Sequence, residues 1–136
     1  MKKYYGKNDA WFLIVFIFYN VFPIILITLN AKTLLSHFWW IFFWIIYYSF
    51  NLFWIPIAVR NRIELFEDYF IFYYGFCKEK IFLKDIIDIH KSRNPIASSA
   101  NSLDRIHVIT KKKDFYVAMK NNDDFIREVL KYKEKR

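Results

Sequence analysis

Two long apolar runs dominate the first half of the chain. They cover Ala10–Leu29 and Leu34–Val59, and neither contains Asp, Glu, Lys or Arg. A helix rises 1.5 Å per residue, so about 20 residues cross a hydrocarbon core of roughly 30 Å. A surface helix of a soluble protein would show polar residues at a period of 3.6, and these runs do not. We therefore predict a transmembrane helical hairpin within residues 1–61.

The short connection Asn30–Thr33 predicts that the two helices are antiparallel neighbours. It carries one basic residue, Lys32, whereas more basic residues flank the other ends of the runs: Lys2, Lys3, Lys7, Arg60 and Arg62. Basic residues accumulate on the cytoplasmic side of membrane proteins. We expect a multi-pass protein of the inner (cytoplasmic) membrane with both termini in the cytoplasm and the connection outside.

A charged start followed by an apolar run is also typical of a secretory signal peptide. The first run is longer than a usual signal-peptide core, and Asn30–Thr33 offers no small-x-small cleavage site. These observations favour a retained membrane helix.

After Arg62 the pattern changes to alternation of apolar and polar residues, which is typical of strands. The turns fall at Glu67-Asp68, Gly75 and Lys111–Asp114, and a polar loop spans Ser92–Ser102. The predicted strands are Arg62–Phe66, Tyr69–Tyr74, Lys78–Leu83, Ile86–Lys91, Asp104–Thr110 and Phe115–Met119. The pairs expected to share a face are Ile81 with Leu83, Ile87 with Ile89, and Ile106 with Val108.

A final amphipathic helix is predicted over Asp123–Lys133, with Asn122 as its N-cap. Acidic residues in its first turn and Lys131 and Lys133 in its last turn complement the helix dipole. Its expected buried stripe is Phe125, Ile126, Val129 and Leu130. Short antiparallel strands followed by one helix make residues 62–136 a cytoplasmic α+β domain.

The second apolar run is unusually aromatic. Trp residues near its ends match an interfacial belt, but Trp44, Tyr47 and Tyr48 lie deeper. They are candidates for an intramembrane contact, whether with the first helix, with lipid or with a second copy of the chain. In the first run Asn20 is expected to hydrogen-bond a freed carbonyl or the neighbouring helix.

The net charge of +8 suits a domain that faces anionic headgroups, although a solvated basic surface explains it equally. The loop between the fourth and fifth strands is the candidate site for a ligand or partner. Its cations, hydroxyls and amides suit a phosphate or carboxylate. The same residues could instead only stabilise turns, with Asp104 paired to Arg105. The candidate residues are Lys91, Arg93, Asn94, Ser98, Ser99, Asn101, Ser102 and Arg105.

Four stretches of the second half carry a family resemblance: Ile81–Ile86, Lys91–Pro95, Ser98–Ala100 and Ser102–Ile106. Through them, residues Ile63–Leu130 resemble the YyaB-like family among the bacterial pleckstrin-homology-like (PH-like) membrane proteins. Leu83 departs from the family pattern, in which proline is common. The resemblance implies a PH-like curved antiparallel sheet with a C-terminal capping helix. It implies no enzyme activity.

The residues themselves predict no catalysis, cofactor or metal site. His90 and His107 lie on neighbouring predicted strands and could approach each other, but no spacing suits a metal or a Cys–His pair with Cys77. Nothing indicates nucleic-acid binding. The leading hypothesis is a non-enzymatic membrane protein whose PH-like domain binds a protein partner or lipid headgroups. The alternatives are a bacteriocin or toxin immunity protein and a structural subunit of a membrane complex.

Overall fold

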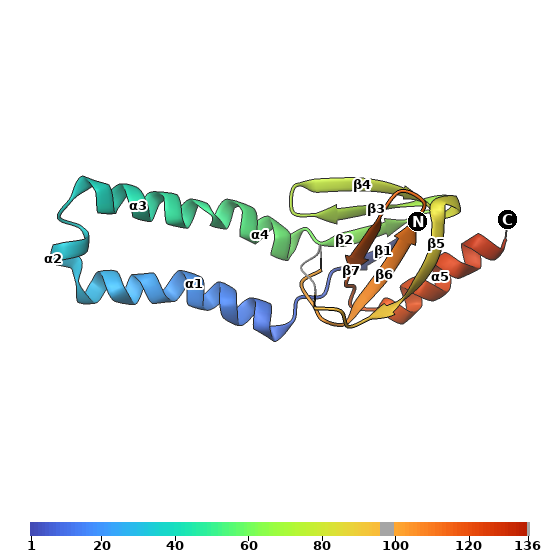
Figure 1. The fold of residues 1–136 in the computed structure, drawn as a ribbon, viewed down its shortest axis with the longest axis horizontal. Helices are drawn as coiled ribbons and strands as arrows, with labels where there is room; N and C mark the ends of the chain where they lie inside the picture. Colours follow the sequence, from blue (N-terminus) through green and yellow to red (C-terminus); the bar gives the residue numbers. More distant parts are fainter. Residues whose placement is uncertain (96–99, 136) are drawn as a thin grey trace.

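The computed structural model describes residues 1–95 and 100–135. A helical hairpin extends from the β domain, and β1 and α5 both lie on the β-domain side (Figure 1). The helices of the hairpin are α1 (Ala10–Leu29), α2 (Ala31–Leu34), α3 (Phe38–Ser49) and α4 (Asn51–Val59). The strands are β1 (Lys2–Tyr5), β2 (Arg62–Leu65), β3 (Tyr69–Tyr74), β4 (Cys77–Phe82), β5 (Ile86–Ser92), β6 (Arg105–Thr110) and β7 (Asp114–Val117). Helix α5 (Asn122–Glu134) ends the domain.

Two helices, Ala10–Leu29 and Phe38–Val59, are long and apolar enough to cross a membrane by length and composition. A core helix of a soluble protein meets the same criteria, but such a helix is mostly buried. Here 11% and 0% of the most apolar windows are buried within the protein. The second helix begins at Phe38 rather than Leu34, because Ala31–Leu34 forms the short helix α2 in the connection.

The two halves of the hairpin are joined by polar contacts. Asn20 and Asn51 hydrogen-bond each other through their amides, with Asn51 Nδ2 2.7 Å from Asn20 Oδ1. Asn20 Nδ2 also donates to the Phe16 carbonyl. The predicted contact of Asn20 with the neighbouring helix is confirmed.

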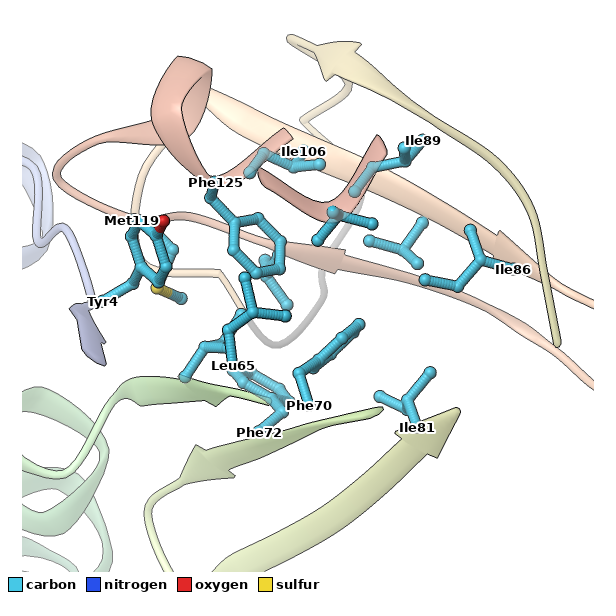
Figure 2. Close-up of a cluster of buried hydrophobic side chains, with 14 of the residues drawn as sticks. Tyr4, Leu65, Phe70, Phe72, Ile81, Ile86, Ile89, Ile106, Met119 and Phe125 are labelled. Carbon is cyan, nitrogen blue, oxygen red and sulfur yellow. The ribbon is translucent and has the colours of Figure 1, made fainter. Parts of the chain in front are cut away.

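The β domain holds two antiparallel sheets, ordered β1-β2-β3-β4 and β5-β6-β7. Side chains from both sheets and from α5 meet in one apolar cluster (Figure 2). Phe125 of α5 occupies its centre and packs edge-on against Phe70 and Tyr4, with ring centroids 5.6 Å and 5.2 Å apart. The α+β architecture with a C-terminal helix on antiparallel sheets is confirmed. The faces assigned to Ile81 with Leu83 and to Ile106 with Val108 are also confirmed, because all four side chains are buried.

Strand β1 was not predicted. Lys2–Tyr5 pairs with β2, with Lys3 opposite Glu64 and Tyr4 opposite Ile63. Beyond β1 the chain continues to the other sheet: Gly6 forms a bridge with Met119, and Lys7 N donates to the Ala118 carbonyl at 2.9 Å. The N-terminal residues therefore belong to the β domain by their pairing, in addition to flanking α1.

Three local predictions were wrong. Ile87 is exposed and Ile86 is buried instead, because a register shift between Ile86 and Asp88 exchanges their faces. Asn122 is the first residue of α5 rather than its N-cap; its side chain accepts from Met119 N and donates to the Asp104 carbonyl. Leu130 is exposed, so the buried stripe of α5 consists of Phe125 and Val129 with Ile126 partly buried.

Candidate functional site

The candidate loop lies where the β domain meets the base of the hairpin. Ser98 and Ser99 fall outside the described residues, and the remaining six candidates divide into two groups. Asn101, Ser102 and Arg105 are buried, with 2%, 0% and 3% of their surface exposed. Lys91, Arg93 and Asn94 are exposed or partly exposed. The sequence pattern did not distinguish the two groups.

Asn101 makes the central contacts of what we call the junction cluster: Asn8, Asp9, Tyr74, Asn101 and Ser102. Its Oδ1 accepts from the Tyr74 hydroxyl at 2.7 Å, and its Nδ2 donates to Asn8 Oδ1 at 2.8 Å. The same amide nitrogen lies 3.4 Å from the Ile57 carbonyl of α4. Burial raises the pKa of the Tyr74 phenol, with Arg105 acting in the opposite direction. Asn101 thus joins α4, β3 and the segment before α1.

Asp9 and Ser102 form the second half of the junction cluster. The Asp9 carboxylate accepts from Ser102 Oγ and from Leu103 N, both at 2.8 Å. Asp9 directly precedes α1, where a negative charge complements the helix dipole. Asn8 Nδ2 also donates to the Ala58 carbonyl of α4 at 2.9 Å. Because buried polar groups are costly unless paired, these bonds fix the loop to both helices of the hairpin.

Arg105 is turned toward its own loop. Its Nε donates to the Ser102 carbonyl at 2.6 Å, Nη1 to the Asn94 carbonyl at 2.9 Å and Nη2 to the Ala100 carbonyl at 3.4 Å. The predicted pairing of Arg105 with Asp104 is wrong, because Asp104 forms its ion pair with Lys7 at 3.0 Å. The guanidinium therefore stabilises the conformation of its own loop by binding three of the loop's backbone carbonyls.

Lys91, Arg93 and Asn94 form the exposed part of the loop. Lys91 Nζ donates to Asp123 at 2.8 Å, and this bond raises the pKa of Lys91. The Arg93 side chain is exposed. Asn94 donates through Nδ2 to the Tyr116 hydroxyl at 3.3 Å. Lys91 and Arg93 are thus exposed cations, and Lys91 is paired with Asp123.

An apolar pocket of about 480 Å³ adjoins the junction cluster. Aromatic side chains of the hairpin, including Phe12, Tyr47 and Trp54, line it together with Tyr74. Its volume lies within the range of small-molecule pockets. Sequence reasoning did not anticipate this pocket, since its walls come from helices and a strand far apart in the chain.

Of the three candidate intramembrane residues, Tyr47 and Tyr48 join the two halves of the hairpin. The Tyr47 hydroxyl donates to the Tyr19 carbonyl at 2.9 Å, and the Tyr48 hydroxyl donates to the Asn20 carbonyl at 3.0 Å. Tyr19 and Tyr47 stack, with ring centroids 4.3 Å apart. The Trp44 ring packs on Phe43 and Tyr47. Both tyrosine hydroxyls thus contribute to packing on the first helix.

His90 and His107 approach each other as expected. They are directly opposed on β5 and β6, with ring centroids 5.1 Å apart. His90 Nδ1 lies 2.8 Å from Asp88, and this bond holds the pKa of the Asp88 carboxyl below its usual value. Among the described residues no group of three or more His, Cys, Asp or Glu side chains could hold a metal ion.

The sequence profile of a bacterial PH domain family matches residues 51–133, from the start of α4 into α5. No curated protein and no solved structure matches the chain. The matched region covers more than half of the chain and contains strands β2–β7, which form the two antiparallel sheets with β1. The chain therefore belongs to the bacterial PH domain family.

Proposed function

We propose that this protein is a non-enzymatic integral membrane protein whose PH-like domain binds lipid headgroups or a protein partner at the inner membrane surface. In this proposal α1 and the α3–α4 pair span the cytoplasmic membrane, both termini are cytoplasmic, and the PH-like domain is of the YyaB-like type. No cofactor and no nucleic acid take part.

The junction cluster gives the main support for this proposal, because it fixes the orientation of the β domain relative to the hairpin. A flexible tether would leave the domain free to turn, whereas the buried side chains of Asn101 and Ser102 form partly buried hydrogen bonds to Asn8, Asp9 and the Ile57 carbonyl, and these hold the domain to both helices. A domain fixed in this way presents one edge to the headgroup layer. The exposed cations Lys91 and Arg93 belong to the loop at this same edge.

The exposed apolar side chains of the hairpin support the membrane-spanning part of the proposal. Outward-facing residues such as Phe18, Trp39 and Leu52 are 62%, 74% and 68% exposed within the protein. Surfaces of this size and composition are costly in water and favourable in hydrocarbon. The excess of basic residues at the β-domain end of the hairpin favours the cytoplasmic placement of that end.

Topology is tested with a membrane-impermeant maleimide on intact cells. In a Cys77→Ser background, a Lys32→Cys variant should be labelled from outside. A Lys112→Cys variant should be labelled only after permeabilisation. Labelling of position 112 in intact cells would refute the orientation, and equal labelling of both positions would refute the spanning hairpin.

Binding is tested with the full chain in nanodiscs, with and without phosphatidylglycerol. If headgroups bind the loop, hydrogen exchange at the amides of residues 91–94 should slow in anionic nanodiscs and recover with salt. An Arg93→Ala variant should lose the effect, whereas Lys112→Ala, a matched cation in a distant turn, should keep it. Equal exchange in both nanodiscs would exclude the headgroup form of the proposal for this loop and leave a protein partner, to be sought by cross-linking at position 93.

A further inference from the structure

The turn between β3 and β4 lies against the hairpin instead of facing open solution. The Phe76 ring packs edge-on against Phe53 of α4, with ring centroids 6.1 Å apart. Gly75 has a φ of +58°, and a Cβ atom built on it would lie 2.9 Å from Ile57 Cγ1. In Figure 1 this end of the β3–β4 hairpin points along the two long helices. The turn is thus seated on the side of α4.

The position of this contact along α4 determines how far from the end of the helix the turn lies. Phe53 precedes Val59, the last residue of α4, by six residues, which is about 9 Å along a helix. The Phe76 ring therefore lies beside the apolar part of α4, not beyond its end. Phe76 and Phe53 remain 64% and 61% exposed within the protein. Burying one such side chain in an apolar medium gains roughly 1.5–3 kcal/mol.

Basic side chains lie on the strands directly behind this turn. Arg62, Tyr73 and Lys78 form one row across β2, β3 and β4, next to the Tyr74–Cys77 pair that closes the turn. The Arg62 guanidinium lies over the Tyr73 ring at 4.3 Å, and Lys78 Nζ lies 5.6 Å from the same ring. Lys78 is the second residue of β4 and follows Phe76 of the turn by two residues, which span at most about 7 Å. An apolar tip backed by cations at this spacing matches acyl chains beneath anionic headgroups.

We propose that the β3–β4 turn, Gly75–Cys77, inserts into the lipid layer beside α4 as a further membrane contact of the protein. Phe76 lies among the acyl chains, and Lys78 lies at the level of the lipid phosphates. This inference rests on the proposed membrane-spanning hairpin, because the depth of Phe76 is set by its contact with Phe53 of α4. It names anionic lipid as the partner of this surface.

Cys77 provides the probe, because it is the one cysteine of the chain and is exposed next to Phe76. The full chain, labelled there with a small environment-sensitive fluorophore, is reconstituted into phosphatidylcholine–phosphatidylglycerol vesicles. We expect brominated lipids to quench the label strongly and aqueous iodide to quench it weakly. A label on Lys112→Cys in a Cys77→Ser background, at the turn between β6 and β7, should show the reverse.

A matched pair of variants tests the role of the phenylalanine. Phe76→Ser should reduce lipid quenching of the Cys77 label at least about threefold, because the apolar anchor is lost. Phe82→Ser removes another exposed phenylalanine, 39% exposed at the far end of β4, and should leave lipid quenching unchanged. Equal quenching in both variants would overturn the assigned role of Phe76.

A label within the hairpin separates the two proposals. Ile17→Cys places a label near the middle of α1, on a residue that is 57% exposed. If lipid quenches this label while iodide reaches Cys77 as freely as position 112, the inserted turn is refuted and the spanning hairpin stands. If lipid quenches neither label, the spanning hairpin itself is refuted. If Cys77 is shielded from both quenchers, protein covers the turn, and the lipid assignment is overturned.

Discussion

Replacing Asn101 with alanine tests whether the junction cluster holds the β domain to the hairpin. The variant loses two short hydrogen bonds, to Tyr74 and Asn8, and a longer one to the Ile57 carbonyl. Each such bond contributes about 1 kcal/mol, and partners left unpaired in a buried site add to the cost. Asn101 is 2% exposed, so water does not readily replace its side chain. We expect the junction to be destabilised by about 3 kcal/mol.

Hydrogen exchange of the full chain in nanodiscs measures this change locally. The amides of Gly6, Lys7 and Asp9 donate across the junction, and that of Leu103 donates to the Asp9 carboxylate. A loss of about 3 kcal/mol should accelerate their exchange by about 10²-fold where exchange reports the opening equilibrium.

The matched control is Asn121→Ala, which changes an exposed asparagine of the same domain and should have no effect. An acceleration of less than about threefold in Asn101→Ala would refute the reasoning. Equal acceleration in β5 and β6 would show that the whole domain, not the junction, had opened.

Three further predictions concern the β domain. Gly6→Ala should strongly destabilise the protein, because the new Cβ would lie 2.3 Å from Asn61 Cγ; the midpoint of chemical denaturation should fall. Phe125→Ala should lower the free energy of unfolding by about 3–5 kcal/mol, measured in the same way. Burial acts to raise the pKa of Asp104, but hydrogen bonds from Lys7 and Asn122 outweigh it and hold that pKa below its usual value. Asp104 therefore stabilises the protein above about pH 3.9 and ceases to do so as the pH falls through its folded pKa, so wild type and Asp104→Asn should converge in stability at low pH.

The strands and the last helix could be predicted because their side chains repeat with the period of the backbone. In β6, Ile106 and Val108 alternate with Arg105 and His107, and both apolar side chains are fully buried. The predicted bounds of β3, Tyr69–Tyr74, are the observed ones. The exchange of Ile87 for Ile86 could not be predicted, because the register shift is a property of the pairing with β6 and has no local signal.

Strand β1 and the junction cluster were missed for a common reason. Lys2–Tyr5 is four residues long and resembles a basic membrane flank, while its partner β2 begins at Arg62. Ser102 and Asp9 are separated by 93 residues. A hydroxyl or amide suits a bound anion as well as an internal carboxylate or carbonyl, so residue type alone does not distinguish a ligand site from a structural contact. Only the tertiary structure shows which candidate side chains already form hydrogen bonds to other residues of the protein.

The family match begins at residue 51, so it leaves out the N-terminal strand β1 that pairs with β2. Residues 51–133 comprise α4, β2–β7 and most of α5, and within that region β2 would be an edge strand of its sheet. Exposed edges invite pairing with other chains. β1 covers this edge, and Tyr4 contributes a buried ring and a hydroxyl that donates to Asp124 at 2.9 Å. Because only Gly6–Asp9 separate β1 from α1, the pairing of β1 with β2 also brings α1 back to α4, so the packing of the hairpin and the packing of the domain depend on each other.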